Sequence, residues 1–210
     1  QMKGDLKHMF SPKVGVGVGF WYEKLEISDY ATVNLADGSP RIVHAVNLTG
    51  LEPADAFADS NYHGTGVAGV MAARTNDGPH FDSLGMAGVC GGNGRDNFGC
   101  RLVPIKISPR HSGYATSYAI STAALYATAV GARAMNLSYA GTSPSRLERL
   151  AMHWAIARGC VVVVAAGNSG YPGGPSVMYP AAYAADGLGI QTGATDRFHQ
   201  RTSWSSYGPD

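Results

Sequence analysis

The sequence predicts an α/β fold, a doubly wound and mostly parallel sheet with helices on both faces. Short apolar segments of strand length alternate with longer, Ala-rich segments of helical length. That alternation is typical of parallel strands joined by crossover helices. The 210 residues suffice for one domain with a sizeable core, and 45% of them are hydrophobic, as is usual for globular proteins. Because no internal repeat, linker or low-complexity tract interrupts the pattern, we expect a single domain over residues 1–210.

The expected elements follow from apolar runs and from the residues that end them. Gly131 is expected to end a helix at residues 116–130. A further helix at residues 144–158 has Pro144 near its start and Gly159 at its end, where these residue types are common. Functional residues of such sheets collect at the carboxyl ends of the strands. Ser138 and Asn168 end or follow two strands, so we expect both on one rim of the sheet. In chain order, we expect strands at residues 14–19, 102–107, 133–138, 160–165 and 187–192, and helices at 63–75, 116–130 and 144–158.

Charge and hydropathy exclude two classes of partner. The formal net charge is +1, from 16 basic and 15 acidic residues, and no polybasic segment is present, so nucleic acid is not expected. The longest purely apolar run, residues 160–166, has the length of a strand, so no membrane span is expected. The chain begins at Gln1 without a signal-peptide pattern, and we expect it to be processed or cut from a larger product.

Two of the three cysteines, Cys90 and Cys100, flank a Gly-rich loop. Such a loop can close as a disulfide in an oxidising compartment, and the alternative is two unpaired thiols at the surface. Cys160 lies in a Val-rich strand and is expected to be a small buried hydrophobe. The spacing contains no Cys-x-x-Cys and no nearby histidine pair, so it does not indicate zinc.

Two polar residues stand out as candidates for catalysis. His63 opens an expected helix whose next residues are small, which lets the helix pack tightly near a reacting centre. A general base needs an imidazole held in this way, although a lone histidine is more often structural. Asn168 follows Gly167 at a strand end, where its amide could donate to a developing oxyanion. The alternative is a turn asparagine in a Gly-rich loop.

Several segments, taken together, carry a family resemblance. HGTGVAG (residues 63–69) resembles the histidine element HGTxVAG of the subtilisin-like serine proteases, and AAGNSG (165–170) resembles their oxyanion asparagine element. YPAAY (179–183), GATD (193–196) and SWSSYGP (203–209) resemble further segments of the same family, in family order, so that the resemblance covers residues 14–210.

The resemblance implies a serine-type endopeptidase that hydrolyses peptide bonds by acyl transfer. His63 would be the base and then the acid, and Asn168 would be the oxyanion donor. MNLSYAG (135–141) resembles the edge segment that pairs with the substrate backbone. The implied substrate-binding residues are Ser138, Tyr139, Ala140, Gly141 and Gly167.

Near its start the sequence departs from the family pattern. Aligned without gaps, VGVGVGFWYEKLEISDY (14–30) puts Phe20 at the position of the catalytic aspartate, and phenylalanine cannot orient a histidine. Glu23 is the nearest carboxylate and could take that role if the turn is remodelled. Asp29 matches an acid that often ligates a structural calcium in this family, and the alternative is a solvated loop acid. Asp55 and Asp59, nearer to His63 in sequence, are expected on a surface loop.

The family's serine element, GTSMAxP, is absent. Gly141-Thr142-Ser143-Pro144 resembles it superficially, but it precedes Asn168, whereas the family's serine follows the asparagine. Pro144 also replaces the small residues that expose the hydroxyl. We therefore expect a catalytic domain truncated before its nucleophile, and an inactive chain when it stands alone.

Three functional hypotheses remain open. The first is a serine endopeptidase in the complete protein, and the second is a pseudoprotease that binds a peptide or a protein partner without cleaving it, as Phe20 suggests. The third is a nucleotide-binding domain, which the glycines of residues 15–19 weakly suggest but which the failed GxGxxG pattern disfavours. The first hypothesis requires no cofactor and allows a structural calcium. It takes a polypeptide substrate and implies a secreted or extracytoplasmic protein.

Overall fold

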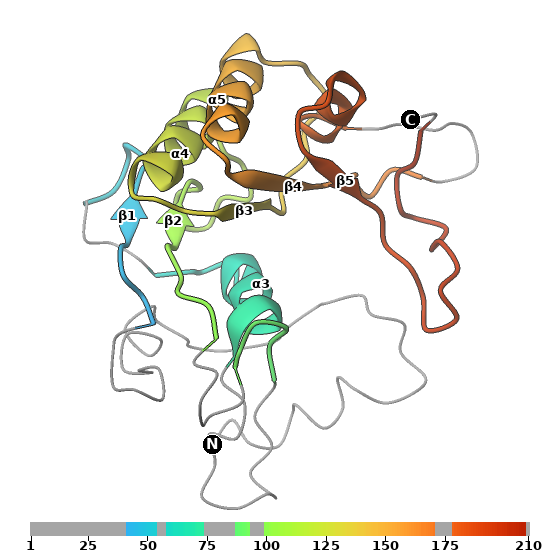
Figure 1. Cartoon of the computed structure of the whole chain (residues 1–210), viewed down its shortest axis with the longest axis horizontal. Coiled ribbons are helices and arrows are strands. Elements are labelled where there is room, and N and C mark those ends of the chain that lie inside the picture. Colours follow the sequence, from blue (N-terminus) through green and yellow to red (C-terminus); the bar gives the residue numbers. More distant parts are fainter. Residues whose placement is uncertain (1–40, 54–57, 74–86, 93–98, 171–177, 209–210) are drawn as a thin grey trace, which may run out of the picture. The chain divides into compact units, whose positions relative to one another are not determined.

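The computed structural model describes residues 41–53, 58–73, 87–92, 99–170 and 178–208 (Figure 1). The chain divides into two compact units, Gln1–Tyr114 and Ala115–Asp210, and each unit is described by itself. The strand expected at residues 14–19 lies outside the described residues, and the single domain stays a prediction.

The first unit contains a short parallel pair of strands, β1 (Val46–Asn47) and β2 (Ile105–Lys106). The sequence predicted a longer strand over residues 102–107 and did not predict β1. Pro104 interrupts the longer strand, because proline has no backbone N–H to contribute to the ladder. Its carbonyl oxygen still accepts a hydrogen bond from the Val46 N–H at 3.3 Å.

Among the described residues of the first unit, one helix is present, α3 (His63–Ala72). The prediction extended it to residue 75, but Ala73 leaves the helix with an extended ψ of 136°. The Ala73 N–H still bonds the Gly69 carbonyl at 2.9 Å, whereas the Ala73 carbonyl accepts from the Gly88 N–H at 2.9 Å. Pairing with a segment distant in sequence therefore ends the helix earlier than local propensity suggests.

The second unit contains a parallel sheet in the order β3–β4–β5 (Figure 1). Its strands are β3 (Ala134–Leu137), β4 (Val161–Ala165) and β5 (Ile190–Thr192). β3 and β4 fall within predicted strands and confirm them. β5 begins three residues later than predicted, because Gly187 (φ 74°) and Gly189 (φ 104°) adopt left-handed backbone conformations that a strand does not contain.

Two helices accompany this sheet: α4 (Ser117–Ala129) precedes β3, and α5 (Arg146–Ala157) connects β3 to β4. Both begin at a residue whose hydroxyl accepts a backbone N–H: Thr116 from Ala119 at 3.1 Å, and Ser145 from Glu148 at 3.4 Å. α5 begins two residues later than predicted, because Pro144 precedes the capping serine instead of lying in the first helical turn. Gly131 and Gly159 follow the two helices with φ of 87° and 82°, as expected of glycines at helix ends.

The core of the second unit lies between the paired helices and the sheet. α4 packs against α5, and α5 packs on β4 (Figure 1). Ile120 and Met152 of the helices and Val162 and Val164 of β4 are each at most 2% exposed. Val161, which alternates with them along β4, is 48% exposed. The period of two along β4 thus buries one face of the strand under the helices.

A short 3-10 helix, η1 (Ala181–Asp186), was not predicted. Its Tyr183 is buried, and the phenol oxygen accepts from the Ser145 N–H (2.6 Å) and donates to the Ser145 carbonyl (2.9 Å). This pair of bonds fixes the start of α5 to the segment that precedes β5.

Candidate active site

Asn168 lies at the carboxyl end of β4, on the rim of the sheet where the sequence placed it. Gly167 before it is buried and has a φ of 110°, a conformation that favours glycine. Asn168 is exposed, and among the described residues its side chain has no hydrogen-bond partner. The side-chain amide of an asparagine carries two N–H donors.

The loop that carries Asn168 is fixed by two buried serines from a distant segment. The Ser206 N–H donates to the Gly167 carbonyl at 2.9 Å, and the Ser169 N–H donates to the Ser206 hydroxyl at 3.0 Å. Gly170 lies directly against Ser205, so that a Cβ built on it would come within 1.9 Å of the Ser205 carbonyl oxygen. The sequence analysis identified residues 203–209 only through the family resemblance. Nothing in their pattern predicts that they form hydrogen bonds with the loop that carries Asn168.

The predicted substrate edge continues β3 beyond Leu137 on the same rim. Gly141 exchanges both of its backbone hydrogen bonds with Tyr179, from Gly141 N–H to Tyr179 carbonyl at 2.7 Å and in return at 2.8 Å. The backbone groups of Tyr139 and Ala140 have no hydrogen-bond partner within the described part of the chain. The segment from Ser138 to Gly141 is thus anchored at Gly141 and open at Tyr139 and Ala140.

A buried carboxyl group lies beneath this edge. Glu148 of α5 is 4% exposed, and burial raises its pKa above the ordinary value of 4.5, with a hydrogen bond from the Ser117 side chain partly opposing the shift. Burial also raises the pKa of the Tyr139 phenol, and the negative charge of Glu148 adds to that effect. The environment beneath the edge segment therefore disfavours the charged forms of the Glu148 carboxyl group and the Tyr139 phenol.

The raised pKa of Glu148 predicts a pH dependence of stability. The folded state binds the Glu148 proton more tightly than the unfolded state, so the free energy of unfolding falls as pH rises from about 4.5 through the folded pKa. Replacing Glu148 by glutamine removes this loss. We expect Glu148→Gln to be more stable relative to wild type at pH 7 than at pH 4, measured by urea unfolding at both values. A stability difference that does not change with pH would contradict it.

His63, in the first unit, is the first residue of α3 and is exposed. The preceding residue, Tyr62, has a left-handed φ of 61° and provides no side-chain cap. Asp59 supplies the missing acceptor, because its carboxylate Oδ2 accepts the Thr65 N–H at 2.7 Å. Asp59 lies in a loop, as expected, and is half-buried. A carboxylate at this end of the helix also complements the positive pole of the helix dipole.

The other candidates from the start of the chain, Phe20, Glu23, Asp29 and the glycines of residues 15–19, lie outside the described residues. Within the described residues, no group of three or more His, Cys, Asp or Glu side chains could hold a metal ion. Calcium at Asp29 stays a prediction. His63 lies in one unit and the edge segment with Asn168 in the other, so each is described within its own unit.

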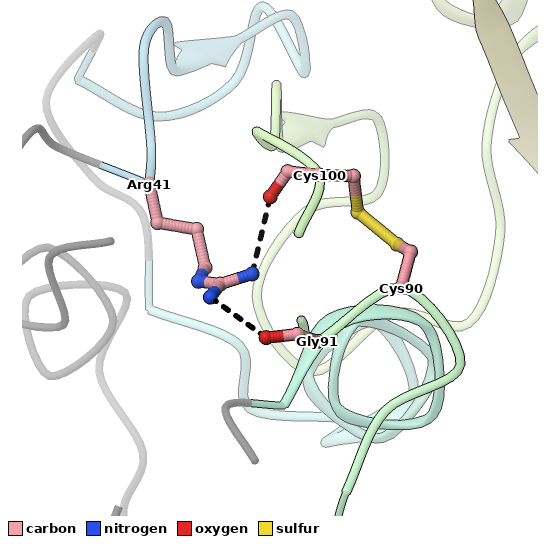
Figure 2. The surroundings of a disulfide bond; sticks show 4 residues. All are labelled: Arg41, Cys90, Gly91 and Cys100. Atoms are coloured by element: carbon pink, nitrogen blue, oxygen red, sulfur yellow. Dashed lines mark hydrogen bonds between the residues drawn. A yellow bond between two sulfur atoms is a disulfide. The ribbon is translucent and has the colours of Figure 1, made fainter. Parts of the chain in front are cut away.

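A disulfide joins Cys90 and Cys100, whose Cα atoms are 5.5 Å apart (Figure 2). Arg41, 2% exposed, donates from its guanidinium to the carbonyl oxygens of Cys100 (3.1 Å) and Gly91 (3.2 Å) (Figure 2). The Cys90 N–H in turn donates to the Met71 carbonyl near the end of α3 at 2.7 Å. This hydrogen bond ties the disulfide to the end of α3, the helix that begins with His63. Cys160 is a buried free thiol, and burial raises its pKa.

No helix in the described ranges is long and apolar enough to cross a membrane. Comparison with known proteins gives sequence relatives. Subtilisin Savinase of Lederbergia lenta is 36% identical over 150 residues, 71% of this chain and 48% of that protein. Subtilisin DY of Bacillus licheniformis is 38% identical over 153 residues, 72% of this chain and 50% of that protein. The match therefore spans about half the length of these relatives.

Solved structures show the same fold. The protease domain of PatA, solved as a point mutant, has a TM-score of 0.61 at 19% identity, covering 79% of this chain and 55% of that one. The prenylagaramide maturation protease PagA has a TM-score of 0.56 at 17% identity, with coverages of 79% and 51%. These likenesses confirm the predicted α/β fold class. The subtilase family model matches residues 31–210, and together with the sequence relatives it shows that the chain belongs to the subtilase family.

Proposed function

We propose that the complete protein is a serine endopeptidase and that this chain supplies its histidine, its oxyanion donor and its substrate edge. The observation that carries the proposal is the exposed Asn168 amide, without a partner among the described residues, on a loop fixed at the rim of a subtilase sheet. Asn168 would donate to the oxyanion of the tetrahedral intermediate. His63 would take the proton of the nucleophile and later give it to the leaving amine.

Peptide recognition would occur at Tyr139 and Ala140. A peptide in extended conformation can add to a sheet edge through its backbone, whatever its side chains. Their open backbone groups support this role, whereas Gly141 would serve to hold the segment through Tyr179. The proposed substrate is therefore a polypeptide, bound next to the Asn168 amide, with no cofactor taking part in the reaction.

The nucleophile in this proposal comes from outside these 210 residues. Ser143 is unsuited to the role, because Ser145 and not Ser143 caps α5, and Pro144 separates Ser143 from the helix.

We expect the isolated chain to hydrolyse a fluorogenic peptide no faster than buffer does, because base and oxyanion donor act on no nucleophile. The assay compares wild type with Ser143→Ala and His63→Ala. Turnover by the wild-type chain that disappears in Ser143→Ala would show the assignment to be wrong.

Phe20 favours a second candidate function, peptide binding without cleavage, because a phenylalanine at the acid position cannot orient the histidine. The longer protein that contains this chain distinguishes the two functions. Peptide hydrolysis that is lost in His63→Ala supports the endopeptidase. Saturable peptide binding with no hydrolysis supports the non-cleaving relative.

A further inference from the structure

We propose that Ser206 is the positioning residue that holds Asn168 in place as the oxyanion donor. The inference rests on the proposed function of Asn168 and adds to it the residue on which its orientation depends. Ser206 does not touch the reacting atoms, so its effect acts through the loop.

Ser206 binds the loop on both sides of Asn168. Its N–H donates to the carbonyl of Gly167, the residue before Asn168, at 2.9 Å. Its hydroxyl oxygen accepts the N–H of Ser169, the residue after Asn168, at 3.0 Å. Asn168 itself has no hydrogen bond within the described residues, so the two flanking bonds fix its backbone while leaving its amide open.

The contact between the two segments leaves little space for adjustment. Ser206 is 2% exposed, and a Cβ built on Gly167 would lie 3.0 Å from the Ser206 hydroxyl oxygen and 2.5 Å from the Met178 Sδ. The Gly170 N–H also donates to the Trp204 carbonyl at 3.1 Å. A residue at position 206 must therefore be small and must offer an acceptor, and serine meets both requirements.

An oxyanion donor contributes to catalysis only if it is already in place when charge develops. A misplacement of about 1 Å can cost about a hundredfold in rate. Because the Asn168 side chain has no hydrogen-bond partner among the residues that the structure describes, we infer its position from the backbone on either side, which Ser206 binds.

The chain offers a matched control in Ser205, which is fully buried next to Ser206. The Ser205 hydroxyl accepts the Ala194 N–H at 2.9 Å and donates to the Ser206 carbonyl at 3.2 Å, but makes no bond to residues 167–170. Removing either hydroxyl leaves one backbone N–H without its acceptor, and removing that of Ser205 also takes a donor from the Ser206 carbonyl, so the control is expected to cost at least as much stability. Of the two hydroxyl groups, only that of Ser206 forms a hydrogen bond with the loop that carries Asn168.

The test measures local order in the 210-residue chain by NMR and so needs no activity. In the wild type, the Ser169 amide should exchange with solvent at least about tenfold more slowly than the Asn168 amide. In Ser206→Ala that protection should be lost, and the Asn168 order parameter should fall from about 0.85 to below about 0.6. Ser205→Ala should leave both unchanged. Ser206→Cys, which fills the site but accepts hydrogen bonds weakly, should behave like Ser206→Ala.

Equal exchange of the Ser169 and Asn168 amides in the wild type, an ordered Asn168 in Ser206→Cys, or the same loosening in Ser205→Ala would overturn the proposal. In the longer protein, Ser206→Ala should lower kcat about tenfold to a hundredfold with KM unchanged, and Ser205→Ala should not. If the loop responds as expected while the longer protein hydrolyses nothing, the positioning role stands and the proposed endopeptidase function fails.

Discussion

Replacing Gly170 by alanine is expected to destabilise the unit that carries Asn168 by about 3 kcal/mol, the upper end of the cost of overpacking a buried site. The new Cβ would lie 1.9 Å from the Ser205 carbonyl oxygen and 2.6 Å from its carbon. These are backbone atoms of a fully buried residue, so neither segment can move without breaking the hydrogen bond between the Gly170 N–H and the Trp204 carbonyl. Urea unfolding followed by circular dichroism measures the loss.

Gly131 provides the control for the glycine substitution itself. It follows α4 with a φ of 87°, and a Cβ there would meet nothing within 4 Å. Gly131→Ala therefore costs only the left-handed backbone strain, about 1–2 kcal/mol. If Gly170→Ala unfolds at the same urea concentration as Gly131→Ala, the close packing of residues 167–170 on the serine segment is not as described.

Removing the disulfide is expected to destabilise the first unit by about 2.7 kcal/mol, from the chain-entropy relation for a closed loop of about 10 residues. The sequence separation of Cys90 and Cys100 is 10. Without the bond, the two carbonyls that accept from Arg41 are no longer held together, which leaves a buried guanidinium with weaker partners. The double variant Cys90→Ser, Cys100→Ser tests this in urea unfolding.

Cys160 must be removed from that comparison, because its free thiol can exchange with the Cys90–Cys100 disulfide once the chain unfolds. In a Cys160→Ala background, adding dithiothreitol should lower the unfolding midpoint to that of the double serine variant. A midpoint that does not respond to dithiothreitol would mean that Cys90 and Cys100 are not bonded in solution.

Local sequence signals predicted the elements of the second unit well. Thr116 and Gly131 mark the start and the end of α4, Gly159 follows the end of α5, and the Val-rich run forms β4. Each of these signals acts within a few residues of its element, and for that reason it can be read from the sequence. One error lies where distant segments meet: α3 stops early because Ala73 pairs with Gly88. Other errors have local causes, since Pro104 shortens the strand expected at 102–107 and Gly187 and Gly189 delay the start of β5. Strands as short as β1 carry no detectable period, so β1 was not predicted.

For the candidate site, the sequence named His63 and Asn168 through their motifs, since the chemistry of a base and of an amide donor is a property of single residues. It also placed Asn168 at a strand end. It did not indicate what holds these residues. Asp59 caps the His63 helix from four residues upstream, and Ser206 supports Asn168 from 38 residues downstream, as their hydrogen bonds show.

The sequence by itself determined the α/β class, the family resemblance and the candidate catalytic residues, because periodicity, capping residues and motifs are local. Tertiary structure alone decided that Gly141 is paired with Tyr179, that Glu148 is buried beneath the edge, and that Ser206 binds on both sides of Asn168. Each of these facts depends on which distant segments pack and form hydrogen bonds with each other in the folded chain. That pairing is a property of the whole packed chain and leaves no pattern in any one segment.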